Sequence, residues 1–216
     1  WNKAPYAGPG LVHLVNTEWG GFDSGEVVQC LPLSAYDVIL DRKSVNPGEH
    51  LFEKMISGMF LGEICRLIAS DLIAKGQLFE GQPCQAFIDE NGFTTATMAD
   101  IEGSSGMAKV KEILEGLELK SVSQKDCQIM KEICTIVSTR AARLTAAGLA
   151  AIAEKLKKVS DCLIAVDGTV FAKYPKFQEK MNLALKEVLG SHGVRFMSAS
   201  DGSGVGAALA AAAITS

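Results

Sequence analysis

The chain has 216 residues, of which 48% are hydrophobic and 21% are charged, and this is the composition of a globular protein with a sizeable core. Its net charge of −4, without a dense Lys/Arg cluster, excludes a typical nucleic-acid-binding surface. The six cysteines form no CxxC pair, which favours free thiols in a reducing compartment over a disulfide framework. The longest run of small apolar residues, 205–214, is too short to span a bilayer, so we expect no stable membrane insertion.

The N-terminal part of the chain contains few regular elements. Residues 1–10 are rich in Pro and Gly and have no helical or strand period, so we expect an irregular segment there and one domain over 11–216. Residues 11–15 (LVHLV) are predicted to form a buried strand, and 27–33 a second one. Because the chain begins with Trp rather than Met, we expect it to continue upstream in a longer protein.

The main helix of the first half is predicted over residues 49–75. Pro47 and Gly48 precede a run of apolar residues at helical spacing. Two residues do not fit a plain amphipathic helix. Gly58 in a helix interior costs about 1 kcal/mol relative to Ala, and Glu53 beside the apolar stripe needs a partner. Both irregularities mark this segment as a candidate functional site.

From residue 89 onward the chain alternates predicted helices and strands. The predicted elements are a loop or hairpin over 89–97, a helix over 106–117, a helical stretch with a break over 124–159, a strand over 163–166, a helix over 175–189, a strand over 194–200 and an Ala-rich helix over 204–214. Small residues at 146–148, 150 and 151 would let a neighbour approach closely. The four consecutive apolar residues LIAV (163–166) predict burial on both faces. This alternation indicates an α/β protein with helices on both faces of the sheet.

Two predicted strands end in a glycine-containing turn, LIAV-DGT and RFMSAS-DGSGVG. Such a turn is either a simple β-turn or a site where backbone N–H groups bind a phosphate, and the residues alone leave both readings open. The glycines at 202, 204 and 206 do not have the Rossmann spacing, and the chain contains no G-x-x-x-x-G-K-[ST] motif.

Glu18 and Glu53 are candidate ligands for a neutral polyol. Glu18 directly follows the LVHLV strand and its short Asn-Thr continuation, and Trp19 and Gly20 come after it. It is either a solvated turn residue or an acceptor of hydrogen bonds from the hydroxyl groups of a ligand. In the second case the nearby glycine would let the ligand come close to the backbone. Glu53 offers the same chemistry from a helix, and His50 lies one turn before it on the same face.

Six blocks of the sequence, in order, resemble the hexokinase family. They are NTEWG (16–20), LPLSAYDVILDRKSVNPG (31–48), FEKMISGMFLGEI (52–64), VSTRAARLTAAGLAAI (137–152), VDGTVF (166–171) and SDGSGVGAALAAA (200–212). The resemblance covers nearly the whole chain from Asn16. It implies an actin-like ATPase (ribonuclease H-like) α/β fold, with a mixed sheet flanked by helices and a hexose and ATP bound between two domains. Residues 11–216 resemble the large, C-terminal domain, and the small domain lies upstream.

The resemblance also implies a reaction and its binding residues. The reaction is transfer of the ATP γ-phosphoryl group, with Mg²⁺, to the 6-hydroxyl of a hexose, which is the first step of glycolysis. The resemblance also implies a cytoplasmic protein and leaves open an association with an organelle through an upstream segment. Glu18 and Glu53 match residues that bind sugar hydroxyls, and His50 stands where the family usually has Gln. The implied ATP-binding residues are Gly58, Met59, Asp167, Gly168, Thr169, Gly202 and Ser203. At Gly58 a Cβ would obstruct the nucleotide.

The sequence departs from the family pattern at two further places. The family's catalytic Asp, its sugar-binding Lys and Asn and its first phosphate loop lie upstream of NTEWG, so this chain carries no implied catalytic residue and no metal ligand. We therefore expect the 216 residues to be inactive alone. Near residues 89–93 the family has a Thr-Arg-Gly-type ATP contact, whereas this chain has DENGF, whose carboxylates would repel phosphate if they pointed inward.

Two other classes of function remain open. One is a hexokinase-like sugar sensor that binds a hexose without turnover, which His50 and the DENGF segment favour. The other is an unrelated actin-like protein with a structural or chaperone role, which would leave Glu18 and Glu53 unexplained. The preferred hexose and the oligomeric state do not follow from the sequence.

Overall fold

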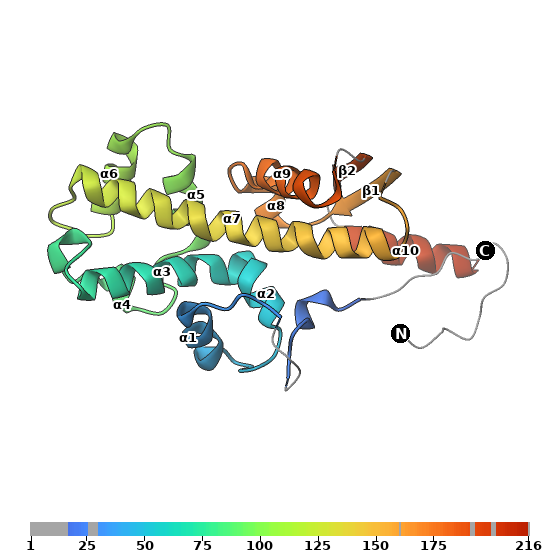
Figure 1. Ribbon diagram of the computed structural model, residues 1–216, viewed down its shortest axis with the longest axis horizontal. Coiled ribbons are helices and arrows are strands. Elements are labelled where there is room, and N and C mark those ends of the chain that lie inside the picture. Colours follow the sequence, from blue (N-terminus) through green and yellow to red (C-terminus); the bar gives the residue numbers. More distant parts are fainter. Residues whose placement is uncertain (1–16, 26–29, 160, 191–192, 200–201, 216) are drawn as a thin grey trace.

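The computed structural model describes residues 17–25, 30–159, 161–190, 193–199 and 202–215. Helix α7 (Gln124–Lys155) runs along the length of the molecule, and most other elements pack around it (Figure 1). By length and composition α7 is apolar enough to cross a membrane, but here it is the central helix of the core. All six cysteines are free, as the sequence predicts.

The elements that precede α7 in the chain are short helices and one longer helix, and they flank α7 on more than one side (Figure 1). In chain order they are η1 (Trp19–Gly21), α1 (Ala35–Lys43), α2 (Leu51–Ile56), α3 (Gly58–Ala74), η2 (Phe79–Gly81), α4 (Gln85–Ile88), α5 (Thr95–Gly103) and α6 (Met107–Glu115). Of the two strands predicted in this region, residues 11–15 and 27–29 lie outside the described residues. Residues 30–33, the rest of the second predicted strand, are irregular.

The single helix predicted over 49–75 is in fact two helices, α2 and α3. The chain breaks at Ser57, which has an extended backbone (φ −77°, ψ 137°) and whose Oγ accepts a hydrogen bond from the Met59 N–H at 3.4 Å. Ser57 is thus the N-cap of a new helix. Gly58 is the first residue of α3 rather than a residue in a helix interior, so the interior-glycine cost does not arise.

The break predicted within 124–159 is absent, since α7 is one continuous helix of 32 residues. It begins at a capping box, in which Ser123 and the Asp126 carboxylate satisfy each other's backbone N–H groups. Ala141, Ala142 and Ala146 are fully buried along its length. The alanine-rich segment therefore serves close packing and does not interrupt the helix.

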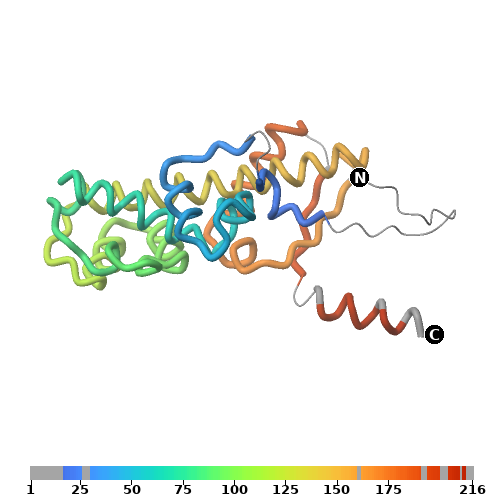
Figure 2. Tube along the Cα trace, turned by 90° about the horizontal axis from the view of Figure 1, so that it is seen from below, coloured from blue at the N-terminus to red at the C-terminus, as the bar shows by residue number. Residues whose placement is uncertain are grey.

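The C-terminal part alternates strands and helices, as predicted. It contains β1 (Asp161–Val166), α8 (Thr169–Lys173), α9 (Phe177–Leu189), β2 (Gly193–Ser198) and α10 (Gly202–Thr215). The two strands pair in parallel, with Asp161 opposite Gly193 and Val166 opposite Ser198. Figure 2 shows α10 set apart from the helical body, and its residues 204–209 are exposed.

The prediction that residues 163–166 are buried on both faces is wrong for this chain. Leu163 is 55% exposed, and Met197 on β2 is 51% exposed. One face of the two-stranded sheet is packed: Val194 and Phe196 lie against buried residues of α7 and α9. Successive side chains of a strand point to opposite faces, so the other half of each strand is left exposed.

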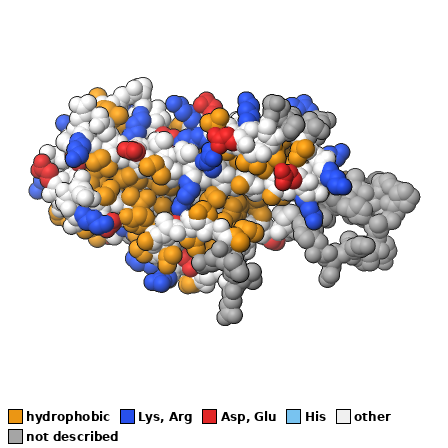
Figure 3. All heavy atoms as spheres, viewed as in Figure 1, with side chains coloured by type: hydrophobic (Ala, Val, Ile, Leu, Met, Phe, Trp, Pro, Cys, Tyr) orange, Lys and Arg blue, Asp and Glu red, His pale blue; other side chains and the backbone are white. Residues whose placement is uncertain are grey.

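The main core lies between α3, α5, α6 and α7. Its interior includes three fully buried phenylalanines, Phe79, Phe87 and Phe93, whose rings contact one another in sequence. Hydrophobic side chains also gather along the middle of the face shown in Figure 3. The helical body is therefore built around one large apolar core, beside which the two-stranded sheet is a small addition.

Candidate active-site cleft

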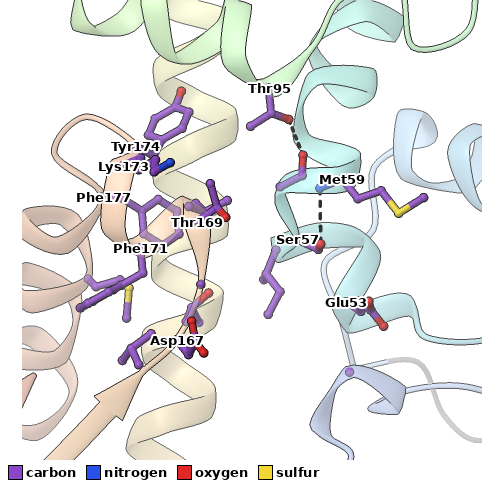
Figure 4. Close-up of a pocket in the computed structure, with 18 of the residues that line it drawn as sticks. Glu53, Ser57, Met59, Thr95, Asp167, Thr169, Phe171, Lys173, Tyr174 and Phe177 are labelled. Atoms are coloured by element: carbon purple, nitrogen blue, oxygen red, sulfur yellow. Dashed lines mark hydrogen bonds between the residues drawn. The ribbon is translucent and has the colours of Figure 1, made fainter. Parts of the chain in front are cut away.

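A cleft of about 1150 Å³ opens between two walls. The α2–α3 wall comprises η1, α2 and the start of α3, and the β1–α8 wall comprises the end of β1, the following turn and α8. In Figure 4, Glu53, Ser57 and Met59 lie on one side and Asp167, Thr169 and Lys173 on the other. The predicted binding residues that line this cleft are Glu18, His50, Glu53, Gly58, Met59, Asp167, Gly168 and Thr169. Gly202 and Ser203 begin α10, and a contact of theirs with ATP stays a prediction.

Glu18 is held in place by its neighbour Trp19. Glu18 has a left-handed backbone (φ 43°, ψ 43°) and precedes η1. The Trp19 ring packs edge-on against Phe52, with 5.4 Å between ring centroids, and it also lies on α7 at Gly148. A Cβ at Gly148 would lie 2.8 Å from Trp19 Cζ3, so only glycine admits the ring there without a shift. For Gly148, the prediction that a neighbour approaches closely is confirmed.

His50 and Glu53 form a polar cluster with Gly20. His50 has a left-handed backbone (φ 54°, ψ 38°), and its N–H donates to Ser24 Oγ at 2.8 Å. Its Nδ1 lies 3.2 Å from Glu53 Oε2, close enough for an ion pair, yet this buried nitrogen has no hydrogen-bond partner among the described residues. A Cβ on Gly20 would lie 3.2 Å from the same Glu53 oxygen. The cluster thus combines a half-exposed carboxylate with an imidazole nitrogen that lacks a well-aligned partner.

Gly58 contacts the opposite wall of the cleft. A Cβ on Gly58 would lie 2.5 Å from Val170 Cγ2 of α8, far inside van der Waals contact. The structure therefore supplies its own reason for glycine at this position: α3 and α8 touch here. The next residue, Met59, is 76% exposed.

The β1–α8 wall carries Asp167, Gly168 and Thr169. The Asp167-Gly168 pair does not reverse the chain. Instead it leads directly from β1 into α8, with Thr169 as the first helical residue. Phe171 of α8 is buried and packs against Phe196 of β2, with 5.5 Å between ring centroids. The strand end, the turn and α8 thus form one packed unit.

Lys173 ends α8 and lines the cleft. Among the described lining residues the carboxylates are Glu18, Glu53, Asp100 and Asp167, and Lys173 is the lone Lys or Arg. We did not predict Lys173 from the sequence, although it lies only two residues after the VDGTVF block. Thr95 and Asp100 of α5 also line the cleft and were not predicted. Thr95 falls within the loop or hairpin predicted over 89–97, whereas the structure begins α5 there, with Thr94 as its N-cap.

A buried polar network holds the end of α8. The Tyr174 hydroxyl donates to Glu102 Oε2 at 2.8 Å, and Ser138 Oγ donates to the same oxygen at 2.6 Å. Lys180 of α9 pairs with the other oxygen of Glu102. Burial and the negative charge of Glu102 raise the pKa of Tyr174 far above its ordinary value, so its hydroxyl stays a donor. Through this network α8 is tied to α5, α7 and α9.

The DENGF segment does not line the cleft. Glu90 pairs with Lys43 at 2.8 Å, and Asp89 accepts a hydrogen bond from Gln85 at 2.6 Å. The Asn91 N–H donates to Glu63 Oε2 at 2.9 Å, which holds the loop against α3. The carboxylates of Asp89 and Glu90 therefore do not point inward, so the phosphate repulsion considered from the sequence does not arise from them.

Comparison with known proteins identifies this architecture. The family model described as Hexokinase matches residues 9–213. Human hexokinase-2 is 38% identical over 205 residues, which is 92% of this chain and 22% of that protein. Human hexokinase HKDC1 is 40% identical over 201 residues, 90% of this chain and 22% of that protein. Hexokinase-1 of Schizosaccharomyces pombe is 36% identical over 204 residues, 92% of this chain and 42% of that protein.

The structural comparison agrees. The structure of a hexokinase from Schistosoma mansoni complexed with glucose has a TM-score of 0.81 and 31% sequence identity, and the match covers 89% of this chain and 44% of that one. The predicted actin-like ATPase fold class is thereby confirmed. The chain spans less than half the length of these relatives. By its sequence profile, its relatives and its fold, the chain belongs to the hexokinase family.

Proposed function

We propose that this chain forms the hexose- and nucleotide-binding part of a kinase that transfers the γ-phosphoryl group of ATP to the 6-hydroxyl of a hexose. The observation that carries the proposal is that two sets of residues, implied separately to bind sugar and nucleotide, line the same cleft. Glu18, His50 and Glu53 lie along one wall, and Asp167 and Thr169 lie along the other. The glucose complex of the Schistosoma mansoni relative supports a hexose as the substrate class.

The sugar would bind at the α2–α3 wall. Carboxylates accept strong hydrogen bonds from hydroxyl groups, and Glu18 and Glu53 offer this chemistry at the surface of the cleft. Gly20 lies against Glu53 and His50 and leaves room beside both. These residues would orient the hexose, since phosphoryl transfer depends mainly on positioning and charge neutralisation.

The phosphates would lie between the start of α3 and the β1–α8 wall. Helix α3 has 17 residues, and its N-terminus at Gly58 and Met59 faces the cleft, where the helix dipole favours an anion. Lys173 supplies a positive charge at the opposite wall. Asp167 fits a role in holding a Mg²⁺-bound water, because proteins bind Mg²⁺ through few carboxylates and leave several waters on the ion. Mg²⁺ would supply charge neutralisation of the transferred group.

The general base implied by the resemblance lies upstream of these residues, so we propose that the 216 residues alone have no appreciable kinase activity. General-base catalysis is worth roughly 10²–10⁴-fold. The test is a coupled assay of hexose-dependent ADP formation, run on the full-length protein that contains this chain and on the 216-residue chain. We expect turnover from the full-length protein only. Absence of hexose-dependent turnover in the full-length protein would refute the kinase assignment, and comparable turnover by the short chain would refute its inactivity.

Two substitutions in the full-length protein test which wall of the cleft binds the hexose and which binds the nucleotide. Glu53→Gln removes the charge of a sugar acceptor and should raise the KM for hexose by about 10- to 100-fold with little change in the KM for ATP. The exposed Glu49, which precedes α2 and does not line the cleft, gives the matched control Glu49→Gln. Unchanged sugar binding in Glu53→Gln would favour a structural role for the protein.

Asp167→Asn should change the Mg²⁺ concentration that the reaction requires. A variant that loses activity while its Mg²⁺ requirement stays the same would contradict the proposed role of Asp167.

A sugar sensor without turnover is the second candidate, and His50 is the observation that favours it. Neutral His and Gln both offer a donor and an acceptor, but with different reach. Calorimetry with hexose beside the phosphorylation assay separates the two functions, because a sensor binds hexose and forms no product. If His50→Gln leaves the hexose affinity and the pH profile unaltered, the presence of His instead of the family's usual Gln has no effect on function.

A further inference from the structure

The loop between α1 and α2 presents a serine directly behind two basic residues. Arg42 and Lys43 end α1, and Ser44 follows them as the C-cap, with an extended backbone (φ −70°, ψ 164°). Val45 is fully exposed, and positions 47–49 of the same loop are exposed as well. Basophilic protein kinases select basic residues beside the acceptor serine by complementary charge. The loop therefore has the charge pattern and the exposure of a phosphorylation site.

The hydroxyl of Ser44 closes the end of α1. Ser44 Oγ donates to the Asp41 carbonyl oxygen at 2.7 Å, and the Ser44 N–H donates to the same oxygen at 3.0 Å. The last carbonyl groups of a helix carry the negative end of its dipole. A phosphate on Ser44 Oγ would remove the first of these hydrogen bonds and would bring a charge of about −1.5 to −2 to this negative end. Phosphorylation would thus oppose the observed conformation of the loop.

The Asp41 carboxylate holds the same loop against α2. It accepts from the Gly48 N–H at 3.0 Å and from Lys54 Nζ at 2.7 Å. Lys54 also donates to the Asn46 carbonyl oxygen at 2.8 Å, and its side chain is only 4% exposed. Loss of one partner from a buried ion pair is costly, because the other charge is left uncompensated. A phosphate two residues before Asn46 would repel Asp41 and attract Lys54, and it would thereby weaken the bonds that hold α2.

Helix α2 connects this loop to the hexose wall. His50 precedes α2, and its N–H donates to Ser24 Oγ, while Glu53 lies beside Lys54 in the helix. Ser44 does not itself line the cleft, so it acts on the α2–α3 wall from outside. The β1–α8 wall has no such connection to the loop among the described hydrogen bonds and ion pairs. A change at Ser44 is therefore expected to alter hexose binding more than nucleotide binding.

We propose that a basophilic protein kinase phosphorylates Ser44 and that the phosphate weakens hexose binding. In this reaction the γ-phosphoryl group of ATP is transferred to Ser44 Oγ, the hydroxyl proton is released and ADP leaves. The phosphate then loosens the Asp41–Lys54 ion pair, and α2 shifts together with Glu53. The effect on hexose rests on the proposed function, whereas the modification itself does not.

The first experiment tests the modification. The full-length protein is incubated with ATP, Mg²⁺ and the catalytic subunit of cyclic-AMP-dependent protein kinase, and the phosphate is located by mass spectrometry. We expect phosphate on Ser44 and far less of it in the double variant Arg42→Gln/Lys43→Gln. Absence of phosphate from Ser44 in the wild type overturns the proposal, and equal labelling of the double variant overturns recognition through the basic pair.

The second experiment tests the effect on the cleft. Phosphorylation should raise the KM for hexose about tenfold and leave the KM for ATP within about twofold, and Ser44→Asp should raise the KM for hexose by about threefold. Kinase-treated Ser44→Ala should stay near the untreated wild type. Ser104→Asp is the matched control, because Ser104 caps α5 in the same way, with Oγ donating to the Asp100 carbonyl oxygen at 2.6 Å, and it follows no basic residue. Its KM for hexose should not change.

A KM for hexose that phosphorylation leaves unchanged overturns the proposed effect. An equal rise in both KM values with a lowered Tm also overturns it, because this result indicates general destabilisation. If the untreated full-length protein shows no hexose-dependent turnover, the proposed function fails, and calorimetry with hexose then tests Ser44 by itself. Weaker hexose binding in the phosphorylated wild type than in kinase-treated Ser44→Ala supports the inference, and equal or absent binding in both overturns it.

Discussion

The two walls of the cleft are held in different ways. On the α2–α3 wall, Trp19 packs against Phe52 and the bare backbone at Gly148, so bulky rings on a glycine fix the position of Glu18. On the β1–α8 wall, α8 has only five residues, and the residue that follows it, Tyr174, is bound by the Glu102 network. One wall is positioned by shape and the other to a large extent by hydrogen bonds and charge.

This difference predicts different sensitivities. Dense packing tolerates little added volume, because a close-packed interior relaxes only partly. A buried polar network tolerates added volume at its rim but suffers when a donor is removed, because its partners are left unsatisfied. Substitutions of matched chemistry on the two walls should therefore change different kinetic constants in the full-length protein.

The largest effect is expected from Gly148→Val. The new side chain displaces Trp19, so the unfolding free energy should fall by about 2 kcal/mol and the KM for hexose should rise about tenfold or more. Chemical denaturation and steady-state kinetics measure the two effects. Ala151→Val, at an exposed position one turn along α7, should leave both near wild type. An unchanged KM for hexose in Gly148→Val would show that the packing of Trp19 on α7 does not position the α2–α3 wall for hexose binding.

Lys173→Met tests charge on the other wall. It keeps most of the side-chain length and removes the charge, so the KM for ATP should rise about tenfold at low ionic strength and by less at high salt. The KM for hexose should not change. Lys176→Met, an exposed position that does not line the cleft, is the control. An equal rise of the KM for ATP in both variants would mean that Lys173 acts only through the overall charge of the surface.

Tyr174→Phe removes one hydrogen bond from the network behind α8. We expect a loss of about 1 kcal/mol in unfolding free energy and a rise of about threefold in the KM for ATP, because α8 is held less firmly. The comparison is Tyr36→Phe, which deletes a similar bond, from Tyr36 Oη to Asp71 at 2.9 Å, between α1 and α3. That variant should lose stability without a change in either KM. A rise in the KM for ATP in both would contradict a specific anchoring role for Tyr174.

The smallest kinetic effect is expected from Ser34→Ala, outside both walls. Burial alone would raise the pKa of Asp37, but hydrogen bonds from Arg140 and Ser34 outweigh it and hold that pKa below its usual value. A depressed carboxyl pKa contributes stability above the unfolded value, about 3.9, that is lost as the pH falls through the folded pKa. Ser34→Ala should thus cost about 1 kcal/mol at pH 7 and less as the pH falls through the folded pKa of Asp37.

Denaturation curves at several pH values measure this dependence. Ser123→Ala is the parallel variant, because Ser123 makes the same capping box with Asp126, whose pKa is also lowered. Both variants should keep wild-type KM values for hexose and ATP. A raised KM in either would mean that stability loss alone disturbs the cleft, and it would weaken the contrast between the walls.

Local patterns predicted α6, α7, α9 and α10, but they did not predict α1, α4, α5 or α8. The helical period continued through Ser57, so one helix was predicted over 49–75, whereas the chain breaks at Ser57 and α3 packs closely against α5 at Gly62 and against α8 at Gly58. The run at 163–166 looked buried on both faces because four apolar residues do not reveal which face finds a partner. Glu53 was found because a carboxylate beside an apolar stripe is conspicuous, but Lys173 and Thr95 looked like ordinary surface residues.

By itself, the sequence determined the family and the alternation of strands and helices in the C-terminal part, because these follow from blocks of similarity and from local spacing. Only the tertiary structure decided which residues meet. Thr95 reaches Gly58 across 37 positions, and Arg140 binds Asp37 across 103. Such partners are selected by how helices pack around α7, and side-chain periodicity specifies a buried face without specifying what lies against it.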